Sequence, residues 1–239
     1  MSKKERSGST GLPKKTKTSR QRAEKILEEL YRHYPDPHCE LNHRNAFELL
    51  IATILSAQTT DVRVNSVTPE LFEAYPDAFS MARAEPENLE RIIHSTRFYR
   101  QKAKSLKATA KLLAEKHQGK VPANMKDLLN LRGVARKTAN VVLGNAFGIN
   151  EGVVVDTHVR RIANRLGLTK EPKNTIKIEE DLMALFPRKE WTNLSHLLIH
   201  HGRNACKARF SEPPDHPVCI QFGRACSCNK NRKMNSDES

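Results

Sequence analysis

Residues 131–139 read Leu-Arg-Gly-Val-Ala-Arg-Lys-Thr-Ala. This stretch predicts the end of one helix, a tight turn at Gly133 and the start of a second helix. Such a turn leaves backbone N–H groups unpaired at a helix N-terminus, where hydrogen-bond donors and partial positive charge suit a phosphate group. An ordinary corner between two packed helices would also use a glycine for backbone freedom. These residues alone therefore leave open both a phosphate-binding turn and a structural corner.

Helical patterns continue on both sides of this turn. Apolar residues recur at three- and four-residue steps from Arg20 to the residues before Pro35, and again between Asn45 and Ser56. Further helix starts are expected at Thr60-Asp61, at Thr68 before Pro69, at Asp77, before Leu89 and near Tyr99. Helices are also expected near 135–147, 157–166, 176–185 and 190–205. Residues 153–155 are all valine, but they are too few for a regular strand, and we expect buried extended chain there. The sequence predicts an all-α protein.

Positive charge is concentrated at the N-terminus. The net charge is +14, and residues 1–22 hold eight Lys and Arg against one Glu, so half of the excess lies there. The rest of the chain is only mildly basic. Residues 1–19 contain almost nothing apolar and are predicted to form a flexible basic arm, which suits a polyanionic partner. The polar residues 229–239 are predicted to form a frayed tail.

The apolar residues and the cysteines bear on where the protein works. No apolar run approaches the roughly 18 to 20 residues of a membrane span, and the N-terminus lacks the apolar stretch of a signal peptide. We therefore expect an intracellular protein without a membrane partner. Cys206, Cys219, Cys226 and Cys228 crowd near the C-terminus, which in an intracellular protein favours a metal site over disulfides.

Two charged residues near the turn are candidates for chemistry. Lys137 stands in the expected second helix, and Asp156 precedes Thr157 and His158 at another expected helix start. Each has an ordinary explanation, because most lysines are solvated and aspartate is among the best N-caps. Neither residue identifies a reaction by itself.

Several stretches together resemble the endonuclease III family of DNA glycosylases. Residues 131–158 resemble its helix-hairpin-helix and the Val-Asp-Thr-His segment that follows. Residues 47–65 resemble its damage-facing segment, and residues 98–103, with Phe98, Tyr99, Lys102 and Ala103, match its intercalation loop more loosely. His201-Gly202-Arg203 before Cys206 resembles the entry to its iron-sulfur loop. The resemblance covers roughly residues 20–228 in order.

The resemblance implies an architecture of two helical lobes with a helix-hairpin-helix motif and a C-terminal cysteine-cluster loop. It places a barrel-like helical domain at about 39–150 and a cluster domain at 20–38 plus 151–228, with double-stranded DNA between them. The protein is expected to be a monomer in the bacterial cytoplasm, bound to DNA that carries damaged bases or abasic sites.

The resemblance also implies the activity and its residues. Lys137 matches the nucleophile and Asp156 the carboxylate of a bifunctional enzyme that removes damaged, oxidised pyrimidines and cuts the DNA 3′ to the abasic site. Gln58 matches a residue that fills the space of the flipped nucleotide, and Phe98 matches an apolar wedge. Two alternatives stay open, a monofunctional glycosylase that uses water and a non-catalytic DNA-binding protein with the same fold.

The hairpin departs from the family pattern at two positions. Arg132 stands where proline is usual, and Ala135 replaces a second glycine. With Gly133, these residues are expected to hold DNA phosphate. Alanine adds a methyl group where phosphate would approach and disfavours a positive φ, whereas Arg132 could add a phosphate contact.

The cysteines also depart from the family pattern, Cys-x6-Cys-x2-Cys-x5-Cys. This chain has Cys206-x12-Cys219-x6-Cys226-x1-Cys228, and Phe222 stands where the third ligand is expected. The resemblance implies a [4Fe-4S] cluster, for which four thiolates suffice in number if Cys226 substitutes for the missing ligand. A tetrahedral zinc site and a loop of reduced thiols remain the alternatives.

Overall fold

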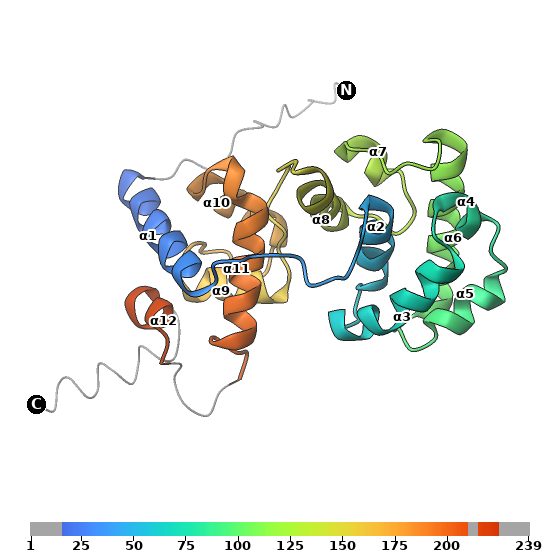
Figure 1. The fold of residues 1–239 in the computed structure, drawn as a ribbon. Helices are drawn as coiled ribbons and strands as arrows, with labels where there is room; N and C mark the ends of the chain where they lie inside the picture. Colours follow the sequence, from blue (N-terminus) through green and yellow to red (C-terminus); the bar gives the residue numbers. More distant parts are fainter. Residues whose placement is uncertain (1–15, 210–214, 225–239) are drawn as a thin grey trace, which may run out of the picture. The chain divides into compact units, whose positions relative to one another are not determined.

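A computed structural model describes residues 16–209 and 215–224, and every regular element in these residues is a helix (Figure 1). The predicted all-α class is confirmed. The predicted arm lies mostly outside the described residues, as do the predicted tail and both Cys226 and Cys228. None of the described helices is long and apolar enough to cross a membrane.

The chain divides into two compact units, one of residues 38–154 and the other of residues 1–37 with 155–239. The first unit contains α2 (Ala46–Leu55), α3 (Asp61–Ala74), α4 (Ala78–Ala82), α5 (Pro86–Ile93), α6 (Tyr99–Lys116), α7 (Met125–Leu129) and α8 (Arg136–Phe147). The second contains α1 (Lys17–His33), α9 (Thr157–Arg165), α10 (Thr175–Leu185), the 3-10 helix η1 (Arg188–Glu190), α11 (Trp191–Asn204) and α12 (Pro217–Phe222).

Helix α2 is the centre of the first unit. Nine of its ten residues are buried, and it packs against α3, α6 and α8, which surround it in Figure 1. Helices α4 and α5 pack against α6 on the far side from α8, and α7 packs against α8. A mainly apolar helix that is buried on nearly all faces needs neighbours on each of them, so α2 fixes where its neighbours lie.

Helix α11 has the corresponding place in the second unit. It packs against α9, α1 and η1, while α1 also contacts α10 and α12. The indole N–H of Trp191, at the start of α11, donates to the carbonyl of Phe186 at 3.1 Å. Residues 153–155, which lead into this unit, are buried and have no regular secondary structure, as expected for extended chain.

Local capping explains most of the helix starts. The side chains of Asn45, Thr60 and Asp77 accept hydrogen bonds from the backbone of Glu48, Arg63 and Ser80, which satisfies a donor that has no partner within the helix. The predicted starts at these positions are confirmed. Helix α1 begins at Lys17, earlier than the expected Arg20, because Thr16 caps it by accepting from the backbone of Ser19.

The predicted helix start at Thr68 with Pro69 is wrong. Helix α3 continues from Asp61 to Ala74 with Pro69 inside it. Pro69 is exposed, whereas Val64, Val67 and Leu71 are buried on the opposite face of the helix. Packing of this face outweighs the backbone hydrogen bond that proline cannot donate.

This explanation predicts that Pro69→Ala stabilises the protein. Alanine restores the N–H group that the carbonyl of Asn65 lacks, and we expect the free energy of unfolding to rise by about 1–2 kcal/mol, because proline's roughly 3 kcal/mol helix penalty exceeds its restriction of the unfolded chain. Denaturant unfolding measures the change, with the exposed Glu73→Ala on the same helix as control. A loss of stability in Pro69→Ala would show that the proline itself supports α3.

Candidate functional site

The turn between α7 and α8 is built around Gly133. This residue has φ +84°, and the backbone N–H of Val134 donates to the carbonyl of Leu131 at 3.2 Å. A Cβ atom on Gly133 would lie 3.3 Å from Cβ of Ser105 and 3.5 Å from Cγ2 of Ile54. The turn therefore requires glycine for its backbone conformation and for its close packing against α6 and α2.

The turn is anchored on one side and exposed on the other. Leu131 and Val134 are buried, and the hydroxyl of Thr109 on α6 donates to the carbonyl of Arg132 at 2.8 Å. The residues between and after these anchors, Arg132, Gly133 and Ala135, are exposed. The backbone of the turn is thus held in place while it faces solvent.

Ala135 is the N-cap residue of α8 and has φ −97° and ψ 172°. The expectation that alanine would be disfavoured here by a positive φ is wrong, since any residue adopts this extended conformation. No side-chain hydrogen bond caps α8 at Ala135, whose methyl group has no acceptor atom. The first N–H groups of this helix are therefore suited to an external anion.

Lys137 is the second residue of α8 and is exposed. The guanidinium of the neighbouring Arg136 donates to the carbonyl of Glu151 at 3.1 Å. Glu151 lies further along the chain in the same unit. The turn therefore places Lys137, exposed to solvent, in the first turn of a helix that has no side-chain cap.

Asp156 belongs to the other unit, where it is the half-buried N-cap residue of α9. Its Oδ1 atom accepts from the backbone N–H of Val159 at 2.7 Å. The capping role is confirmed, and it holds the carboxylate at a helix N-terminus, where negative charge is stabilised. The pKa of His158, two residues later, is lowered, and burial is the largest cause. Burial outweighs the negative charge of Asp156, which acts to raise this pKa.

Gln58 and Phe98 share an unusual backbone conformation. Both are exposed, and they have φ angles of 54° and 59°. Gln118 is the third described residue other than glycine with a positive φ. Residues with side chains persist in this left-handed region only where the surrounding structure holds them, and such positions concentrate at functional sites.

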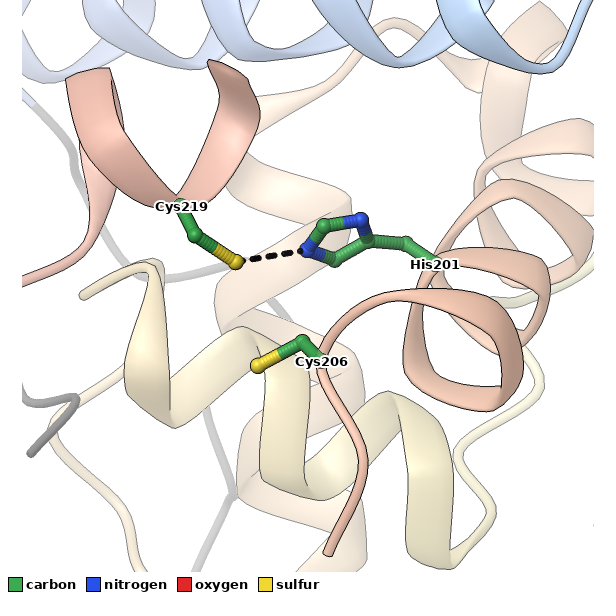
Figure 2. Close-up of side chains that lie close together, drawn as sticks. All are labelled: His201, Cys206 and Cys219. Atoms are coloured by element: carbon green, nitrogen blue, oxygen red, sulfur yellow. Dashed lines mark hydrogen bonds between the residues drawn. The ribbon is translucent and has the colours of Figure 1, made fainter. Parts of the chain in front are cut away.

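Two of the four predicted metal ligands converge inside the second unit, and a histidine joins them. Figure 2 shows Cys206, Cys219 and His201, which are all buried and whose ligand atoms all lie within 4.8 Å of one another. Nε2 of His201 lies 3.2 Å from Sγ of Cys219, and Nδ1 of His201 lies 3.3 Å from the hydroxyl of Tyr34. Sequence reasoning did not name His201 as a candidate ligand, although its spacing to Cys206, His-x4-Cys, is of a kind found in metal sites.

The surroundings of Cys206 favour its thiolate form. A hydrogen bond from Cys219 is the largest cause that lowers the pKa of Cys206 to about 4, with further contributions from His201 and Arg165 against the opposing effect of burial. The guanidinium of Arg165 lies 3.0 Å from Sγ of Cys206. Two cysteine sulfurs and an imidazole at this separation form a donor set that suits zinc or iron. Phe222, at the expected third ligand position, is buried in α12.

Comparison with known proteins gives consistent matches over most of the chain. The family model of the HhH-GPD superfamily of base excision DNA repair proteins matches residues 51–188. Endonuclease III of Synechocystis sp. is 50% identical over 219 residues, which are 92% of this chain and 97% of that protein. Endonuclease III of Escherichia coli K12 is 41% identical over 184 residues, 77% of this chain and 86% of that protein. A solved structure of a trapped endonuclease III–DNA covalent intermediate, an estranged-adenine complex, is 41% identical with a TM-score of 0.81, covering 90% of this chain and 98% of that one.

The packing of the turn predicts that two glycine substitutions differ in cost. Gly148 has φ +67°, and a Cβ atom added there would have no other atom within 4 Å. Gly148→Ala should therefore lower the unfolding free energy only by the penalty of a left-handed backbone for alanine, about 1–2 kcal/mol. Gly133→Ala should cost more, because its methyl group also presses on Ser105 and Ile54. Denaturant unfolding of both variants measures the difference. Equal losses would show that close packing does not constrain the turn.

Proposed function

This chain belongs to the endonuclease III family of the HhH-GPD base excision DNA repair proteins, and we propose that Lys137 is its nucleophile and Asp156 its catalytic carboxylate. The protein is a bifunctional DNA glycosylase and abasic-site lyase that acts on DNA with damaged bases. The observation that supports the lysine is its place as an exposed residue in the first turn of α8, directly after the anchored turn at Gly133. We further propose that oxidised pyrimidines are its substrates and that it acts on DNA in the bacterial cytoplasm.

A primary amine explains both reactions of such an enzyme. The neutral amine of Lys137 attacks C1′ of the sugar, the bond from C1′ to the base breaks, and the base leaves with the electron pair and takes up a proton. After the ring opens, the amine nitrogen and C1′ form an iminium ion. This ion makes the C2′ proton acidic, so a base removes it, the bond from C3′ to oxygen breaks and the 3′ phosphate leaves.

Asp156 supplies negative charge for this chemistry. Positive charge develops on the sugar as the base leaves, and a fixed carboxylate stabilises that charge without reorganising. The hydrogen bond from Val159 to Oδ1 supports this assignment, since it fixes the position of the carboxylate group. The carboxylate is also suited to proton transfer at the sugar.

The exposed residues around the turn suit binding to DNA. The backbone N–H groups at the start of α8, with Gly133 and Ala135, can bind phosphate, and Arg132 can add a charged contact. Gln58 would fill the space of the extruded nucleotide, and Phe98, with 56% of its surface exposed, would act as the wedge. Extrusion is necessary because C1′ cannot be reached by the amine while the nucleotide is stacked in the duplex.

The two rival functions are not favoured. A monofunctional glycosylase that activates water has no use for an exposed lysine at position 137. A non-catalytic DNA-binding protein would need neither Lys137 nor Asp156, and the matches to endonuclease III extend over nearly the whole chain.

The cysteine group can hold a metal cofactor, and we propose a [4Fe-4S] cluster bound by Cys206, Cys219, Cys226 and Cys228. Convergence of Cys206 and Cys219 on one buried point supports the proposal, as does the hydrogen bond from Arg165 to Cys206, since clusters are stabilised by donors to their sulfur ligands. Such a cluster would hold the loop after α11 in place. A single zinc ion bound by His201, Cys206 and Cys219 is the alternative, which the close approach of His201 favours.

The lysine assignment predicts a covalent complex between the protein and abasic DNA that borohydride reduction makes permanent. Lys137→Ala should lower trapping and strand cleavage by about a thousandfold or more, as loss of a covalent nucleophile does. Lys120→Ala, which changes another exposed lysine of the same unit, should trap as the unchanged protein does. Trapping by Lys137→Ala at the rate of the unchanged protein would refute the assignment.

The cofactor proposal predicts that anaerobically purified protein is yellow-brown and contains about four iron atoms per chain. His201→Ala should then keep most of its iron, because histidine is no ligand of this cluster, and Cys219→Ser should lose it. Zinc in a one-to-one ratio that His201→Ala abolishes would support the zinc site instead. Colourless, folded and active protein without either metal would exclude both.

A further inference from the structure

Lys102 is a buried lysine on α6, only 5% exposed, among the few charged side chains in the core of its unit. Its Nζ atom donates to the carbonyl of Leu55 at 2.6 Å and to the hydroxyl oxygen of Thr59 at 2.7 Å. Lysine is almost never buried without such partners, because removing the ammonium group from water is costly. The two hydrogen bonds therefore replace lost hydration and fix the side chain in one position.

The ammonium group suits the end of α2. Leu55 is the last residue of that helix, so its carbonyl is one of those that have no partner further along the helix and carry partial negative charge. Burial lowers the pKa of Lys102 to about 8, which leaves the side chain mainly charged at neutral pH. Lys102 thus caps α2 from a helix that lies 47 residues further along the chain.

Thr59 joins this lysine to two exposed loops. Its hydroxyl oxygen accepts from Nζ of Lys102 and from the backbone N–H of Arg97 at 3.2 Å. The backbone N–H of Lys102 in turn donates to the carbonyl of Phe98 at 3.0 Å. One lysine and one threonine therefore connect the loop after α2 with the loop before α6.

Two of the three described residues other than glycine with left-handed backbones lie next to these contacts. Gln58 precedes Thr59 itself, and Phe98 follows Arg97, which is a partner of the threonine hydroxyl. Left-handed residues with side chains relax unless their neighbours are held. The hydrogen bonds of Lys102 and Thr59 act at the positions where such restraint is needed.

We propose that Lys102 is a positioning residue that couples the two loops, so that Gln58 and Phe98 enter damaged duplex DNA as one preorganised unit. The inference rests on the proposed function, in which these two side chains accompany extrusion of the damaged nucleotide. Extrusion costs unstacking and unpairing energy, and ordering two separate loops at the same step would add to that cost. Lys102 removes this cost before the DNA binds.

Coupling should matter most where extrusion is hardest. Removal of a base-paired lesion requires both unpairing and unstacking, whereas an abasic site has no base to unpair. Loss of Lys102 should therefore slow base excision from a duplex more than cleavage at a preformed abasic site. A merely structural role would slow both reactions alike.

The test compares single-turnover rates of Lys102→Met on duplex DNA with an oxidised pyrimidine and on the same duplex with an abasic site. Base excision should fall by roughly 10- to 100-fold, as expected for lost hydrogen bonds to a charged group, and abasic cleavage by less than about threefold. Fluorescence of 2-aminopurine opposite the lesion should show slower extrusion. Lys111→Met on the exposed face of α6 is the matched control and should change neither rate.

Substitutions at Thr59 keep the test decisive if Lys102→Met fails to fold. Thr59→Val removes the shared hydroxyl and should reproduce the loss of base excision, whereas Thr59→Ser retains the hydroxyl and should restore the rate to within about threefold. Equal rates for the valine and serine variants would contradict the coupling.

A combined variant separates this inference from the proposed function. Gln58→Ala with Phe98→Ala should itself slow base excision, and adding Lys102→Met should then cost less than about threefold, because the coupled side chains are already absent. Lys102→Met should not lower the rate of base excision as much in the double alanine variant as it does in the unchanged protein. Equal decreases in the two proteins would overturn the coupling and leave the insertion roles intact. Base excision by the Gln58→Ala, Phe98→Ala protein at the unchanged rate would refute the insertion roles and the coupling with them.

Discussion

The position of Lys137 depends on the packing of Gly133 against α2 and α6. Because Gly133 has no side chain, the turn lies close to Ile54 and Ser105, and Thr109 holds the carbonyl of the preceding residue. Helix α8 therefore begins at a fixed place, with exposed residues at its start and no side-chain cap. Since α2 is buried on nearly all faces, the turn packs against a helix that is enclosed by its neighbours. An active lysine on a surface helix would otherwise have no defined position relative to bound phosphate.

The same helix also organises the residues proposed to enter DNA. The end of α2 supplies the carbonyl that Lys102 caps, and the loop that follows contains Gln58 and Thr59. One buried helix thus supports, at one place, the turn proposed to bind phosphate and, at another, the loops proposed to enter DNA. Sites that require precise geometry are commonly built on such rigid elements, with strained residues confined to the adjoining loops.

Local chemistry made much of the fold predictable from the sequence. The helix starts at Thr60 and Asp77 follow from side chains that bond to their own helix, and the turn at Gly133 follows from a residue that tolerates a positive φ. Pro69 led to a wrongly predicted helix start, because the opposite face of α3 packs in the core and keeps the helix continuous through the proline. The sequence named His201 and Lys102 only as parts of stretches that resemble the family. Their contacts could not be predicted, because the partners are distant in sequence and meet only in the folded chain.

The assignment of Lys137 as the nucleophile is tested most directly by mapping the attachment site of DNA after borohydride reduction. The protein offers many lysines, including the buried Lys102 and several exposed ones, so the identity of the modified residue is informative. Digestion of the reduced complex and mass spectrometry of the peptides should locate the sugar adduct on Lys137 alone. An adduct on any other residue, in protein that cleaves abasic DNA at its full rate, would contradict the account.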